Sequence, residues 1–108
     1  MKPGTDINTR HIDQISAFLK TMAEVYSASH YSDIKGDIKI ITLIFPKNEW
    51  RGLEIVIKYP TNSMFPDLDL TFKSAVSDPT ILCTKDESVA KMFITSVLQM
   101  YEPREERF

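Results

Sequence analysis

The chain has 108 residues, of which 43% are hydrophobic and 26% charged, and it carries a formal net charge of -2. This composition is typical of one globular domain rather than a disordered or fibrous chain, and the near-neutral charge argues against a dedicated nucleic-acid binder. The one cysteine, Cys83, excludes an intramolecular disulfide, and no apolar run approaches the roughly 18 residues that span a bilayer. We therefore expect a single domain over residues 1–108 that is intracellular, cytoplasmic or nuclear, with no membrane partner.

The first expected element is an amphipathic helix of about five turns. Asn8 or Thr9 supplies the N-cap, and the serines from Ser27 onward end the helix by offering the backbone competing hydrogen bonds. Residues 1–7, which contain Pro3 and Gly4, are expected to be flexible, as is the charged tail 103–108. Apolar residues recur along the helix at three- and four-residue spacing: Ile12, Ile15, Leu19, Met22, Ala23 and Tyr26.

The segment 37–45 is rich in β-branched residues, and both of its faces are largely apolar. This pattern predicts the most buried strand of the protein. Pro46 ends the strand, and residues 47–52 are expected to form an exposed hairpin loop.

The two following strands each show a clean alternation with a period of two. Residues 53–59 and 68–73 are joined by a loop that holds Pro60 and Pro66. One face of this pair should be covered and the other can stay in contact with water. The apolar residues that share the first face are Leu53, Ile55, Ile57, Tyr59, Leu68, Leu70 and Phe72.

A short strand at 81–83 and a second helix complete the expected elements. Thr84 and Glu87 have the spacing of a capping box, and Pro103 ends the helix. The order predicts an α+β two-layer sandwich, with a helix, a three- or four-stranded antiparallel meander and a helix. The apolar stripe expected on the second helix comprises Val89, Met92, Phe93, Val97, Met100 and Tyr101.

No residue pattern of a catalytic, metal or cofactor site is present. His11 and His30 stand in no metal-binding motif, and the three glycines do not form a phosphate loop. Cys83 lies beside Ile81 and Leu82, which favours a buried small apolar residue over a reactive thiol. We expect no enzyme and no cofactor; a thiol-dependent activity through Cys83 ranks third among the functional hypotheses.

Two kinds of exposed residue are candidates for binding a partner. Aromatic and arginine side chains in loops suit a protein hot spot or base stacking, and lysines on the wet sheet face suit polar contacts. Trp50 could equally fold back over the sheet edge, and this alternative stays open. The candidate partner-binding residues are Lys47, Trp50, Arg51, Met64 and Phe65 in the loops, and Lys58 and Lys73 on the sheet face.

The segment Ile41 to Ile81 resembles the central meander of the ubiquitin-conjugating-enzyme-like superfamily, which includes the non-catalytic RWD domains. Catalytic members continue with His-Pro-Asn, but this chain has Asp78, Pro79 and Thr80, and Cys83 follows too soon to match their active-site cysteine. The resemblance therefore implies a non-catalytic docking module. It rests on similarly placed residues over about 40 positions: Pro46, Gly52, Tyr59, Pro60, Pro66, Phe72 and Pro79.

The leading functional hypothesis is a non-enzymatic protein-protein interaction module, an adaptor within an intracellular assembly. Its partner would be another protein or a second copy bound through an exposed strand edge. The alternative is a small RNA-binding protein, because Ile55 to Lys58 and Leu68 to Met92 are similar to an Alu-domain subunit of the signal recognition particle. The phosphate-facing patch of that alternative would comprise Lys39, Lys47, Arg51, Lys58 and Lys73.

Overall fold

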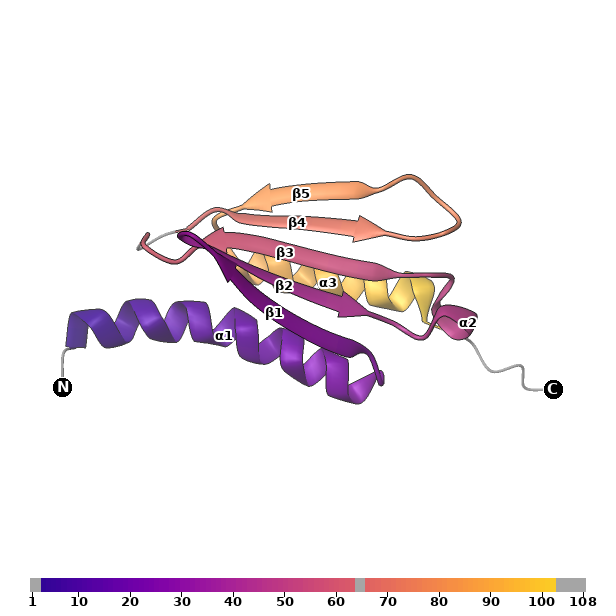
Figure 1. Ribbon diagram of the computed structural model, residues 1–108, viewed down its shortest axis with the longest axis horizontal. Helices are drawn as coiled ribbons and strands as arrows, with labels where there is room; N and C mark the ends of the chain where they lie inside the picture. Colours follow the sequence, from indigo (N-terminus) through magenta and orange to yellow (C-terminus); the bar gives the residue numbers. More distant parts are fainter. Residues whose placement is uncertain (1–2, 64–65, 103–108) are drawn as a thin grey trace.

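The computed structural model describes residues 3–63 and 66–102, with side-chain surroundings from residue 14 onward except at residue 47. Five antiparallel strands form one sheet in their chain order, β1-β2-β3-β4-β5, and α3 lies behind its central strands (Figure 1). This arrangement confirms the predicted α+β fold with an antiparallel meander between two helices. The elements are α1 (Pro3–Val25), β1 (Ser29–Lys35), β2 (Ile38–Ile44), α2 (Lys47–Trp50), β3 (Glu54–Pro60), β4 (Leu68–Lys73), β5 (Thr80–Thr84) and α3 (Glu87–Tyr101).

The alternation in β3 and β4 decides which face of the sheet is covered. Ile57 and Leu70 are cross-strand neighbours and both are fully buried, while Lys58 and Asp69, one residue along each strand, are exposed. The buried set meets Ile15 and Leu19 of α1 and the apolar side of α3 in one core. All seven residues predicted for the covered face of these strands are buried.

The sheet has one more strand than expected, because residues 29–35 pair with β2 instead of ending the first helix. Gly36 adopts a positive φ of 61° in the two-residue turn that joins β1 to β2. All residues of β1 except His30 are exposed, so the strand carries no apolar alternation. Backbone pairing with β2 from Ser29 to Lys35 holds it in place.

The prediction that β2 is buried on both faces is wrong. Ile41 and Leu43 point into the core and are fully buried, but Ile38 is 38% exposed and Ile40 and Ile44 are only partly covered. No helix among the described residues covers that second side. The apolar side chains there form part of the protein surface.

The helix ends also differ from the prediction. Pro3 is the first residue of α1, a position where proline fits because its missing amide is not needed, so residues 3–7 are helical rather than a flexible arm. The rest of the predicted flexible ends, 1–2 and 103–108, lie outside the described residues. Asp86, not Thr84, is the N-cap of α3: its Oδ1 accepts from the Ser88 and Val89 amides at 2.8 and 3.4 Å.

The buried stripe of α3 is rotated relative to the prediction. Met92 and Met100 are 68% and 69% exposed, and Val89 is 41% exposed. Of the predicted stripe, Val97 is buried, and Phe93 and Tyr101 are partly buried against the core. The residues that complete the covered side are Ala90, Ile94 and Leu98.

None of the helices that the structure describes is both long enough and apolar enough to cross a membrane.

Candidate functional site

The sheet has one face that the described helices leave uncovered, on the side opposite α3 (Figure 1). We call it the outer face. Its side chains alternate with inward-pointing ones along every strand, as the antiparallel registers require. The outer face comprises Ser29, Tyr31, Asp33, Lys35, Ile38, Ile40, Thr42, Ile44, Glu54, Val56, Lys58, Pro60, Asp69, Thr71, Lys73, Ile81 and Cys83.

An uncharged row crosses the middle of the outer face from one edge strand to the other. Each member is the cross-strand partner of the next, so the row runs perpendicular to the strands. Tyr31 and Ile81, at its two ends, are 57% and 69% exposed. This central row consists of Tyr31, Thr42, Val56, Thr71 and Ile81.

Four charges surround the centre of this row. Lys58 lies opposite Asp69 on one side, and Glu54 lies opposite Lys73 on the other. Along each strand the two charges have opposite signs and stand two residues either side of Val56 or Thr71. Among the described residues, none of the four is in an ion pair within 4 Å. We call Glu54, Lys58, Asp69 and Lys73 the charge square, because like charges occupy its diagonals.

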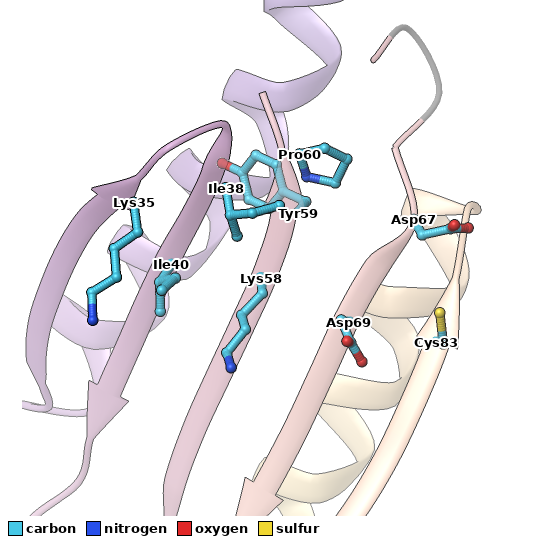
Figure 2. Close-up of a pocket in the computed structure, with 9 residues that line it drawn as sticks. All are labelled: Lys35, Ile38, Ile40, Lys58, Tyr59, Pro60, Asp67, Asp69 and Cys83. Atoms are coloured by element: carbon cyan, nitrogen blue, oxygen red, sulfur yellow. The ribbon is translucent and has the colours of Figure 1, made fainter. Parts of the chain in front are cut away.

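One end of the outer face is hollowed into an open depression of about 540 Å³ (Figure 2). Lys35, Lys58 and Asp69 reach it from β1, β3 and β4, and Ile38 and Ile40 supply its apolar floor. Asp67 on its rim pairs with Lys85 at 3.1 Å, and both side chains of that pair are well exposed. The depression therefore offers mixed charges around an apolar patch, which is typical of a protein contact surface.

Cys83 is exposed, so the prediction that it is buried is wrong. The reason is that side chains along β5 alternate between the two faces of the sheet. Leu82 points inward, opposite Leu70, so Cys83 points outward on this edge strand. Its cross-strand neighbour is Asp69, not the histidine that usually activates a thiol nucleophile. Within the described part of the chain, no group of histidine, cysteine and acidic residues could hold a metal ion.

Trp50 is not available to a partner, because it is 3% exposed. Its ring lies 4.8 Å from that of Phe45 and 5.1 Å from that of Tyr26 between centroids. The segment expected to be an open loop folds into α2 instead, and the Trp50 amide donates to the Pro46 carbonyl at 2.9 Å. The prediction of Trp50 as a contact residue is wrong, and the alternative that it folds back over the sheet holds.

The remaining loop candidates do not form one site. Arg51 is exposed, with its guanidinium carbon 5.7 Å from the centre of the Tyr101 ring. Met64 and Phe65 lie outside the described residues, as does the side chain of Lys47. Lys58 and Lys73 are both on the outer face, as predicted.

The basic residues of the RNA hypothesis whose side chains the structure describes are not gathered into one patch. Lys39 is the cross-strand neighbour of Tyr59 and points to the same inner face of the sheet. Lys58 and Lys73 point to the opposite face. Those two lysines each stand beside a carboxylate of the charge square. The outer face consequently offers no continuous positive surface for phosphates.

A polar cluster closes the other end of the sheet, where the chain leaves β4. The Tyr101 hydroxyl lies 2.9 Å from Ser77 Oγ and 3.1 Å from Ser74 Oγ. The hydrogen bonds from Ser74 and Ser77 lower the pKa of Tyr101, with a smaller contribution from the Arg51 charge. The cluster anchors the β4–β5 loop to the last turn of α3.

The sequence contained one signal for the outer face that the prediction misread. Ile38, Ile40 and Ile44 made β2 apolar on both sides, a pattern that usually indicates burial on both sides. An apolar second face on a strand of an open sheet equally indicates a contact surface. Comparisons with protein-family models, curated proteins and solved structures give no match to this chain.

Proposed function

We propose that this protein is a non-enzymatic docking module that binds a protein partner on its outer face. The observation that carries the proposal is the exposed second side of β2 next to the uncharged central row. Ile38, Ile40 and Ile44 place branched apolar side chains on a face that the described helices leave uncovered. Contiguous apolar surface with a polar rim is typical of interaction sites on soluble domains.

Charge supports a protein partner over a nucleic acid. The charge square sums to zero, with Glu54 and Asp69 balancing Lys58 and Lys73. A phosphate backbone requires an excess of positive charge, whereas a protein surface can match charges of both signs. The open, mixed depression around Lys35 and Asp69 fits the polar rim of such an interface.

We also propose that the chain is a distant non-catalytic relative of RWD domains. The support is the order of the elements, with a helix before an antiparallel meander and another helix after it. The residues that carry the resemblance include Tyr59 and Pro60 at the end of β3 and Phe72 in β4. Docking is the role that this resemblance implies.

A pair of matched variants tests the docking proposal. Val56→Asp puts a charge at the centre of the outer face, and Met92→Asp puts the same charge on an exposed position of α3. Tagged wild type and both variants are used to capture proteins from the native cell, followed by quantitative mass spectrometry. We expect a defined set of proteins that Val56→Asp loses and Met92→Asp retains. Equal capture by all three proteins would place the interaction elsewhere.

A further inference from the structure

We infer that the occupant of the outer face is a second copy of this chain, packed face to face about a two-fold axis that runs along the central row. The inference rests on the proposed docking function and names its partner. Its support is that the four charges of the charge square meet opposite charges of a second copy in only a few two-fold arrangements. The central row, which would lie on the axis, carries no charge at all.

The two-fold rotation can be followed residue by residue. The rotation turns over the outer face of the second copy and reverses the direction of its strands. Each strand therefore stacks on the same strand of the second copy. A residue two places before the central row then lies over the residue two places after it. Lys58 comes over Glu54 of the second copy, and Asp69 comes over Lys73 of the second copy. Each of these opposite-charge contacts occurs twice, because the interface is isologous.

The apolar positions fit the same rotation. Ile40 comes over Ile44 of the second copy, and the members of the central row meet their own copies. Val56 and Thr71 at the centre therefore meet without like-charge repulsion. Sheets that pack face to face are rotated by about 30°, so the central contacts are the ones that superpose best.

Other two-fold arrangements fit less well. An axis parallel to the strands along β3 would stack Lys58 on Lys58 and Glu54 on Glu54, which is repulsive. An axis parallel to the strands between β3 and β4 would satisfy the four charges but leave β1, with Tyr31, beyond the edge of the contact. The axis along the central row is the one that pairs the four charges of the charge square and covers all five strands.

The outer face is large enough for such a contact. Five strands about 4.8 Å apart and about 3.4 Å per residue over five to seven residues give a face of roughly 500 Å² in projection. The relief of its side chains adds to the accessible area. A standard interface buries about 800 Å² per partner, so the outer face is on the scale of a stable dimer.

Charge reversal tests the arrangement through the dissociation constant measured by sedimentation equilibrium. Lys58→Glu puts a carboxylate over Glu54 of the second copy, and we expect the dimer to weaken roughly tenfold or more. The full inversion, Glu54→Lys with Lys58→Glu, Asp69→Lys and Lys73→Glu, restores every pair with the signs exchanged. We expect this quadruple variant to recover dimerisation, because no charge outside the square is altered.

Chemical cross-linking tests the position of the axis. In a Cys83→Ser background, Ile81→Cys brings two thiols across the axis, within the span of a short bismaleimide that bridges the roughly 10 Å between packed sheets. Thr80→Cys, on the opposite face of the same strand, is the matched control. We expect a covalent dimer from Ile81→Cys and none from Thr80→Cys.

Three results would overturn this inference. They are a wild-type protein that stays monomeric at concentrations on the order of 1 mM, a dimer unaffected by Lys58→Glu, and equal cross-linking of the two cysteine variants. The broader docking proposal fails by a different result, equal capture of cellular proteins by wild type and Val56→Asp. If the wild-type protein is monomeric and Val56→Asp still loses the captured cellular proteins, self-association is rejected and the docking proposal stands.

Discussion

Trp50 packs against Phe45 with their ring centroids 4.8 Å apart, and Tyr26 contacts the same indole ring edge-on at 5.1 Å. Trp50 is the last residue of α2, Phe45 directly follows β2 and Tyr26 directly follows α1. They close one end of the core, so the most conspicuous aromatic residue of the sequence stabilises the fold instead of meeting a partner.

Trp50→Ala should lower the free energy of unfolding by about 3–5 kcal/mol, the usual cost of removing a large buried aromatic side chain. Urea unfolding followed by circular dichroism measures the change. Met92→Ala, at a position 68% exposed, is the control and should stay within about 0.5 kcal/mol of wild type. Similar small effects from both variants would mean that Trp50 is at the surface.

Gly52→Ala should destabilise the protein more than Gly36→Ala. Both glycines have a positive φ, 74° and 61°, so alanine strains the backbone at each, by about 1–2 kcal/mol. At Gly52 the new Cβ would also lie 3.2 Å from the Ala75 Cβ, whereas at Gly36 nothing lies within 4 Å. Thermal unfolding of the two variants side by side checks the order, and a larger loss at Gly36 would contradict it.

Asp86→Ala should cost about 1 kcal/mol, because Asp86 Oδ1 caps the first amides of α3. Asp86→Asn, which keeps an acceptor oxygen, serves as the control and should retain most of the stability. Thr84 has a different role, since its Oγ1 accepts from the Asp86 amide at 3.0 Å. Chemical denaturation of the two Asp86 variants tests the assignment, which equal losses would refute.

Tyr101→Phe should cost about 0.5–1.5 kcal/mol at neutral pH, since it removes the hydroxyl that contacts Ser74 and Ser77. The lowered pKa of Tyr101 adds a pH dependence. In the folded state Tyr101 loses its proton below the pH at which the unfolded chain does, so the unfolded state binds more protons between the two pKa values. The stability of wild type relative to Tyr101→Phe should therefore rise as the pH approaches 10.0.

Tyrosinate absorbance of the folded proteins supplies the second readout for Tyr101. The difference between wild type and Tyr101→Phe should show a tyrosine that ionises below its ordinary pKa of 10.0. A difference spectrum that titrates at or above that value would show that the serine contacts do not favour the ionised form.

The central strands could be predicted because their alternation is strict. In β3 and β4 every second residue is a large apolar one, and the residues between them are charged or polar except Val56 and Pro60, so a single register satisfies burial. β1 could not be predicted in the same way, since almost all of its side chains are exposed and its stability comes from pairing with β2. An edge strand of this kind leaves no hydrophobic pattern in the sequence.

The helix α3 shows why the buried side of an element can be predicted wrongly even when the element itself is predicted correctly. Met92 and Met100 share one side of the helix and Ile94 and Leu98 share another, so apolar periodicity alone allows two rotations. The position of the sheet selects the second. β2 posed the same ambiguity, because both of its faces are apolar. Ile40 is only partly covered since none of the described helices packs on that face.

The central claim is that both helices cover one face of the meander and leave the other free for contacts. Val56 and Ile57 are consecutive residues of β3 that point to opposite faces. The most direct test compares the free energies of unfolding of Val56→Asp and Ile57→Asp from urea titrations at protein concentrations below the dissociation constant of the proposed dimer. We predict a cost of about 1 kcal/mol for Val56→Asp, on the scale of strand propensity, and loss of the folded state for Ile57→Asp, whose carboxylate would be buried without a partner. Comparable losses for the two variants would show that both faces are covered and would contradict the account.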